Sequence, residues 1–172
     1  MDKLWAPWRL AYITAPKDKT AAGDDCFICR AAAGADDRAN LVVYRTELSV
    51  AVLNLYPYNN GHLLVTPKAH KARLDELTPD ELLDAQLVIQ KMIGVVERRM
   101  TPDGFNVGLN LGRAAGAGVP GHLHWHLVPR WFGDSNFMTA VGDARVLSQS
   151  LEALYDLLTE ELRGEPGASA TG

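Results

Sequence analysis

The sequence predicts an α+β fold: a mainly antiparallel five-stranded sheet with one long helix and a C-terminal helix. Short apolar runs bounded by turn residues recur along the chain and are typical of strands. Two longer segments repeat apolar residues at spacings of three and four, as amphipathic helices do. The predicted order is β-β-β-α-β-β-α with short hairpin-like links, which favours antiparallel pairing.

Composition is that of an ordinary globular protein. The chain has 172 residues, of which 47% are hydrophobic and 22% charged, which excludes collagen-like, coiled-coil and wholly disordered classes. This length suggests a single domain with a substantial core. We expect that domain to span residues 1–163, with residues 1–25 as an N-terminal extension and linker and residues 164–172 as a disordered tail.

The first elements follow the polar linker that ends at residue 25. A short helix is expected around residues 26–33. Two apolar runs at residues 41–46 and 48–54 predict a pair of strands. The segment YPYNNG at residues 56–61 is rich in turn residues, and a third strand over residues 62–66 ends at the following proline.

The long helix is marked by a clear start signal. Thr78 is a good N-cap, Pro79 suits the first helical position and Glu81 completes a capping box. The helix should run to about Met100, because Thr101 is followed by a proline. One core-facing stripe is expected from the residues at helical spacing, which are Leu82, Ala85, Ile89, Met92 and Val96.

Two further strands are predicted at residues 105–111 and 122–131. The glycine-rich loop GRAAGAGVPG joins them. A C-terminal helix is predicted from a leucine stripe formed by Leu147, Leu151, Leu154, Leu158 and Leu162.

Charge and targeting signals narrow the function classes. A net charge of −4 argues against a general nucleic-acid binder. We expect a cytoplasmic protein without membrane association, because neither a signal-peptide core nor a membrane-spanning run is present and two cysteines cannot staple a secreted scaffold. The aromatic residues Trp5, Trp8 and Tyr12 are expected to pack on the body or on a second subunit rather than on a membrane surface.

Three of the five histidines alternate with apolar residues in HLHWHLV, residues 122–128. In a strand, His122, His124 and His126 share one face, while the residues between them face the core. Alternate side chains lie about 6.5–7 Å apart along a strand, so all three imidazoles do not easily ligate one metal ion. A row of separated imidazoles suits an extended anionic group better.

This motif resembles the signature of the histidine triad (HIT) superfamily. LNLYPYNNGHLLVTPKAH (residues 53–70) is similar to the family's nucleotide-binding block, and NLGRAAGAGVPGHLHWHLVPRW (residues 110–131) to its phosphate loop and catalytic strand. The resemblance covers residues 26–131. The segment LVPRWFGDSNFM resembles a bacterial subgroup related to diadenosine tetraphosphate phosphorylases and fragile-histidine-triad hydrolases. The uridylyltransferase branch is set aside, because it has glutamine where this chain has His126.

The resemblance implies a catalytic set of three histidines. His124 corresponds to the nucleophile that attacks an α-phosphate and forms a nucleotidyl-histidine, and His126 to a phosphate-contacting residue. His62 matches another position near the phosphates, although a buried structural histidine is the alternative. A neutral imidazole suits nucleophilic attack at pH 7.

Nucleotide-binding residues are also implied by the resemblance. Asn54 matches a ribose-binding position, although a turn role is the alternative, and Asn110 matches a phosphate-binding position. Glycine-rich loops let backbone N–H groups approach an anion, and here that segment is Gly116, Ala117, Gly118 and Val119. Many family members have Gly-Gln-Ser or Gly-Gln-Thr before the valine, so this chain lacks a side-chain donor there and its leaving-group preference is open.

Cys26 and Cys29 have metal-ligand spacing. Alone, a CxxC pair is also compatible with a redox pair or with buried thiols. The resemblance to bacterial family members implies a structural zinc ion held by Cys26, Cys29, His70 and His122.

The resemblance as a whole implies an enzyme that cleaves a nucleoside phosphate, with dinucleoside polyphosphates such as diadenosine tri- or tetraphosphate as substrates. Hydrolysis and phosphorolysis stay open. The rivals are a phosphoramidate hydrolase of the Hint type, a non-catalytic nucleotide-binding protein and a protein whose functional centre is zinc. A homodimer is expected, because the family usually joins two sheets across a subunit interface.

Overall fold

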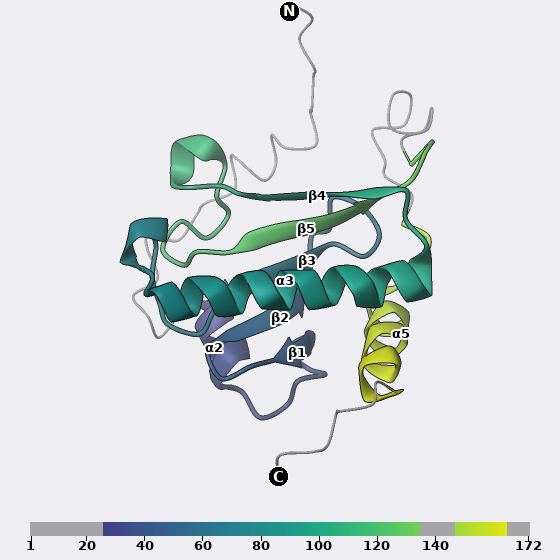
Figure 1. The fold of residues 1–172 in the computed structure, drawn as a ribbon, viewed down its shortest axis with the longest axis horizontal. Coiled ribbons are helices and arrows are strands. Elements are labelled where there is room, and N and C mark those ends of the chain that lie inside the picture. The colour runs from purple at the N-terminus through teal and green to yellow at the C-terminus, as the bar shows by residue number, and fades with distance from the viewer. Residues whose placement is uncertain (1–25, 135–146, 165–172) are drawn as a thin grey trace, which may run out of the picture.

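The computed structural model describes residues 26–134 and 147–164. They form a five-stranded antiparallel sheet in the order β1-β2-β3-β5-β4 (Figure 1). The strands are β1 (Val42–Arg45), β2 (Ser49–Leu53), β3 (Leu63–Pro67), β4 (Gly104–Leu109) and β5 (Trp125–Arg130). This confirms the predicted α+β class and its antiparallel sheet. Trp5, Trp8, Tyr12 and the tail after residue 164 lie outside the described residues.

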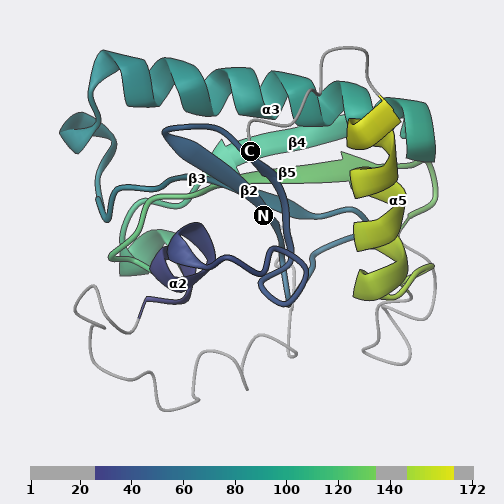
Figure 2. The ribbon, with the colours of Figure 1, turned by 90° about the horizontal axis from the view of Figure 1, so that it is seen from below.

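Within residues 26–134 and 147–164, three α-helices pack around this sheet. They are α2 (Phe27–Ala33), α3 (Pro79–Met100) and α5 (Leu151–Gly164), with short 3-10 helices at Leu74–Glu76 and Arg113–Ala115. Seen along the plane of the sheet, α3 lies on one side and α2 on the other (Figure 2). In the described residues, no helix is both long enough and apolar enough to cross a membrane.

The main core lies between the sheet and the two long helices. Alternate residues of the central strands enter it, including Leu63 and Val65 of β3 and Trp125 and Leu127 of β5. A smaller cluster lies on the opposite face under α2, made of Ala31, Val42, Val50 and Val52. Because side chains alternate between the two faces of a strand, one face of each central strand packs against the main core and the other face lies on the side of the sheet away from α3.

The start of α3 is as predicted. Thr78 accepts a hydrogen bond from Glu81 N–H, and the Glu81 carboxylate accepts one from Thr78 N–H. The predicted stripe is partly wrong, because Leu82 is 39% exposed. Glu81 takes the inward position of the first turn, where Lys71 pairs with it. Val88 and Val95 extend the buried stripe.

The C-terminal helix is shorter at its start than the leucine pattern predicts. Ser150 caps it by accepting a hydrogen bond from Ala153 N–H, so α5 begins at Leu151. Leu147 precedes the helix and is 40% exposed, so its place in the stripe is wrong.

The predicted strand over residues 122–131 also starts later, at Trp125. In the register of β3 with β5, Val65 pairs with Trp125, so Leu123 lies opposite Pro67, which has no N–H to donate. The Leu123 carbonyl instead accepts a hydrogen bond from the Thr66 hydroxyl at 2.8 Å, and Leu123 N–H donates to Lys71 O at 2.7 Å. His122 and His124 therefore lie in an extended segment before β5, and His126 lies within β5.

Candidate active site and metal centre

The sheet face opposite α3 carries three histidine rings in contact. His126 lies on β5 opposite Leu64, His124 lies two residues earlier, and His62 immediately precedes β3. The ring centroid of His126 is 5.2 Å from that of His62 and 5.1 Å from that of His124. The structure thus brings together the three histidines that the sequence predicts to act together.

The tautomer of His62 is fixed by a backbone donor. Tyr58 N–H donates to His62 Nδ1 at 2.9 Å, so this nitrogen carries the lone pair and Nε2 carries the proton. His62 Nε2–H then donates to His126 Nδ1 at 3.0 Å. Burial lowers the pKa of His62 to about 3, with the nearby His126 as a second cause, so the ring is neutral at pH 7.

This chain of hydrogen bonds continues to a nitrogen with no protein partner. Because His126 Nδ1 accepts from His62, the proton of a neutral His126 ring is on Nε2. Burial lowers the pKa of His126 to about 4. His126 Nε2 is one of two buried side-chain polar atoms in the described residues that lack a hydrogen-bond partner. A buried donor of this kind calls for an acceptor from a ligand.

His124 presents the opposite kind of nitrogen. Its Nδ1–H donates to the backbone carbonyl of His122 at 2.8 Å, so its Nε2 carries the lone pair. Burial lowers the pKa of His124, which keeps the ring neutral at neutral pH. A neutral imidazole with a fixed lone pair is ready to act as a nucleophile.

Tyr58 and Asn54 complete the surroundings of His62. The Tyr58 ring stacks on His126 with centroids 5.4 Å apart and tilts against His62 at 4.6 Å. Asn54 accepts from Tyr56 N–H through Oδ1, and its Nδ2 lies 3.2 Å from His62 Nδ1. The sequence analysis did not identify Tyr58, because it lies in the turn-rich segment YPYNNG. Its polar contact with His62 is made by the backbone N–H, which every residue type except proline has.

The glycine-rich loop leads directly to the histidines. Gly116 has a φ of +88°, a conformation that favours glycine. Ala117 is buried and donates its N–H to Gly112 O, while the Val119 carbonyl accepts from His122 N–H. Gly118 is exposed, and Asn110, just after β4, is half-buried. Their contact with phosphates stays a prediction.

A second cluster lies next to this site. One ligand atom from each of Cys26, Cys29, His70 and His122 lies within 4.8 Å of the others, and both cysteines are free thiols. His122 Nδ1 is 3.4 Å from each sulfur, and His70 Nδ1 is 3.2 Å from Cys29 Sγ. Two sulfur and two nitrogen donors at this spacing fit a tetrahedral zinc ion.

The carbonyl of Pro67 orients the His122 ring toward the two thiols. His122 Nε2–H donates to it at 2.8 Å, so the lone pair of His122 is on Nδ1 and faces the thiols. Burial and the adjacent Cys26 raise the pKa of the Cys29 thiol to about 11. A bound cation would favour the thiolate instead.

The three contacting histidines and the four residues of the Cys/His cluster lie within or close to a segment that matches a known domain family. A sequence model of the HIT domain matches residues 36–133, more than half of the chain. The chain belongs to the histidine triad family. The three histidines in contact, His62, His124 and His126, all lie in that segment, whereas Cys26 and Cys29 precede it.

Related HIT proteins extend the similarity beyond the domain. The chain is 41% identical over 169 residues to an AP-4-A phosphorylase of Mycobacterium tuberculosis, covering 96% of this chain and 87% of the relative. It is 43% identical over 89 residues to an asymmetrical bis(5'-nucleosyl)-tetraphosphatase of Schizosaccharomyces pombe, covering 52% of this chain and 48% of the relative. A zinc-bound histidine triad family protein of Mycobacterium smegmatis has a similar structure, with a TM-score of 0.67, 27% identity and coverage of 82% and 95%.

Proposed function

We propose that this HIT protein cleaves dinucleoside polyphosphates at an α-phosphorus through a covalent nucleotidyl intermediate on His124. One observation carries the proposal: neighbouring imidazoles present a lone pair on His124 Nε2 and a buried, unpartnered N–H on His126 Nε2. A nucleophile beside a fixed hydrogen-bond donor is what phosphoryl transfer requires. The names of the relatives support the substrate class.

The chemistry follows from these two nitrogens. His124 Nε2 donates its electron pair to phosphorus, forming an N–P bond while the bond to the leaving polyphosphate oxygen breaks. His126 Nε2–H donates a hydrogen bond to a phosphate oxygen and stabilises the charge that develops there. Water or inorganic phosphate then displaces the imidazole, which restores the neutral ring.

Substrate positioning is assigned to the surrounding segments. Asn54 is proposed to bind the ribose, and Asn110 and the segment Gly116–Val119 the phosphates. Gly118 supports this role, because it is an exposed glycine and any side chain there would hinder close approach of an anion. Ala117 has no side-chain donor and its N–H bonds to Gly112 O, so we assign phosphate contact in this segment to the backbone N–H groups of Gly118 and Val119.

Product analysis on diadenosine tetraphosphate tests the reaction type. ADP plus ATP formed only when phosphate is present identifies a phosphorylase, and AMP plus ATP formed without phosphate identifies a hydrolase. Absence of cleavage under both conditions contradicts the proposal, and cleavage of adenosine phosphoramidate in its place supports a phosphoramidate hydrolase.

His124→Ala separates an enzyme from a nucleotide-binding protein. We expect kcat to fall by at least about 10³-fold, because the nucleophile is lost, while AMP binding changes by less than about threefold. Wild-type turnover in this variant would refute the assignment of the nucleophile.

We also propose that the Cys26, Cys29, His70 and His122 cluster holds a structural zinc ion. Zinc would link α2 to the segment that carries His122 and His124, and it supplies folding energy when bound. Because thiolate ligands need reducing conditions, a cytoplasmic location fits this site.

A homodimer formed along β4 completes the proposal. β4 is an edge strand, and Val107 is 47% exposed, although Phe105 and Leu109 on either side of it pack against the core. An exposed edge with an apolar residue favours pairing with a second copy. Val107→Lys should convert the dimer to monomer in light scattering, and a monomeric wild-type protein would contradict this interface.

A further inference from the structure

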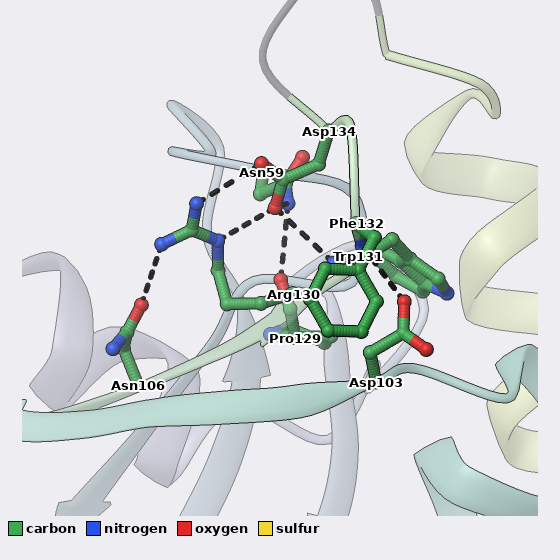
Figure 3. A network of polar contacts seen from close by, with 8 residues as sticks. All are labelled: Asn59, Asp103, Asn106, Pro129, Arg130, Trp131, Phe132 and Asp134. Atoms are coloured by element: carbon green, nitrogen blue, oxygen red, sulfur yellow. Dashed lines mark hydrogen bonds and ion pairs between the residues drawn. The ribbon is translucent and has the colours of Figure 1, made fainter.

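A largely shielded carboxylate lies just beyond the end of β5. The Asp134 side chain is 9% exposed and pairs with Arg130, whose Nε is 2.6 Å from Oδ2 and whose Nη2 is 3.0 Å from Oδ1 (Figure 3). The other arm of the same guanidinium donates to Asn106 of β4 at 2.8 Å. Arg130 lowers the pKa of Asp134 to about 2, so the carboxylate stays charged over the working pH range.

The same carboxylate also binds the turn before β3. Asp134 Oδ2 accepts from Asn59 Nδ2 at 2.8 Å, and this amide nitrogen also donates to Pro129 O at 3.0 Å. Asn59 therefore ties its turn to β5 through the Pro129 carbonyl and to the segment after β5 through Asp134. Gly61 brings the turn close to β5, since a Cβ there would lie 3.0 Å from Pro129 Cγ.

This turn supplies the donor that fixes the histidine tautomers. Tyr58 directly precedes Asn59, and its N–H is the group that bonds to His62 Nδ1. The Asn59 carbonyl, in turn, accepts from His62 N–H at 3.3 Å. A shift of Asn59 therefore moves the Tyr58 N–H away from His62 and leaves the longer contact from Asn54 Nδ2, 3.2 Å from Nδ1, to favour this tautomer.

We propose that Asp134 is a positioning residue for the triad. Through Asn59 it holds the Tyr58 N–H against His62 Nδ1, which keeps the proton on His62 Nε2 and, through that bond, on His126 Nε2. The expected effect of Asp134 on turnover rests on the proposed function. Its expected effect on the His62 and His126 tautomers rests on the hydrogen bonds alone.

The test compares Asp134→Ala and Asn59→Ala with the wild type, all as the full zinc-loaded chain. In histidine ¹⁵N NMR, the wild-type spectrum should show one protonated and one lone-pair nitrogen in His62, with the proton on Nε2. Both variants should show a mixture of the two tautomers.

For diadenosine tetraphosphate cleavage we expect kcat to fall about tenfold with less than about threefold change in KM. The double variant should lose no more than Asn59→Ala alone, because Asp134 acts on His62 through Asn59.

Asp103→Ala is the matched control. Its carboxylate accepts from Phe132 N–H at 2.7 Å in the same turn after β5 but is not bonded to Asn59. This variant should be destabilised and yet keep the His62 tautomer and kcat of the wild type. An unchanged His62 tautomer in both Asp134→Ala and Asn59→Ala would overturn the proposal. If the wild type cleaves no dinucleotide, the proposed function fails, and the NMR comparison still decides the role of Asp134.

Discussion

His124 and His126 lie two residues apart and adopt opposite tautomers: Nε2 carries the lone pair in His124 and the proton in His126. A carbonyl acceptor fixes the proton of His124 on Nδ1, whereas a ring donor fixes the proton of His126 on Nε2. The sequence motif identifies both residues but contains nothing about their tautomers, because these depend on groups from His122, His62 and Tyr58. The hydrogen-bond partner of each ring nitrogen therefore determines whether that nitrogen acts as a donor or as a nucleophile.

The neutral state of His62 makes the folded protein sensitive to acid. Its pKa is about 3 in the folded chain and about 6.5 when unfolded, so between these values only the unfolded state binds the proton. Stability therefore falls as pH decreases from 7, and His62 contributes a loss of about 2 kcal/mol by pH 5.

We expect His62→Gln to remove this contribution. Urea unfolding of the zinc-loaded protein at pH 7 and pH 5 measures it as the difference between the two free energies of unfolding. The variant should show about 2 kcal/mol less pH dependence than the wild type. An equal pH dependence in both proteins would mean that His62 is charged or exposed in the folded state.

The placement of α2 depends on one side chain from the sheet. The Arg45 guanidinium donates to the carbonyls of Ala31, Ala32 and Gly34 at the end of this helix and pairs with Asp37. These are carbonyls that the helix itself leaves without partners. Because Cys26 and Cys29 lie at the other end of α2, Arg45 also positions two of the proposed zinc ligands.

Arg45→Met should loosen this helix and weaken zinc binding. We expect a loss of about 2–3 kcal/mol of stability, because several carbonyls lose a charged donor. Zinc affinity measured by chelator competition should fall by about tenfold or more. Arg38→Met is the control, since it removes a similar side chain whose ion pair with Asp156 is exposed. Equal zinc affinities in the two variants would contradict the role of Arg45.

In the molecule as a whole, the cluster of Cys26, Cys29, His70 and His122 joins segments that are far apart in sequence. Cys26 immediately precedes α2 and Cys29 lies in its first turn, His70 follows β3, and His122 precedes β5. His122 contributes its ring to this cluster and its backbone carbonyl to His124. That carbonyl is also held independently, because the next residue, Leu123, bonds to both Lys71 and Thr66.

Zinc removal should therefore affect stability more than chemistry. Protein purified without chelator should contain about one zinc per chain. We expect chelation to lower the free energy of unfolding by at least about 3 kcal/mol, while turnover per folded molecule stays within about threefold. Zinc far below one per chain would disprove the site. Complete loss of turnover in apoprotein that is still folded would make zinc the functional centre.

The sequence by itself determined the antiparallel α+β architecture, the start of α3, the alternation of histidines with core residues and the metal-ligand spacing of Cys26 and Cys29, whereas His70 and His122 were added to that set by the resemblance to the HIT family. These features depend on local periodicity, capping and side-chain chemistry, which a sequence displays directly. Only the tertiary structure decided that β5 begins after His124, because that boundary depends on Pro67 in another strand. It also decided the tautomers of the triad and the role of Asn59 and Asp134. A hydrogen bond between residues 75 positions apart follows from strand order and register, which local patterns do not specify.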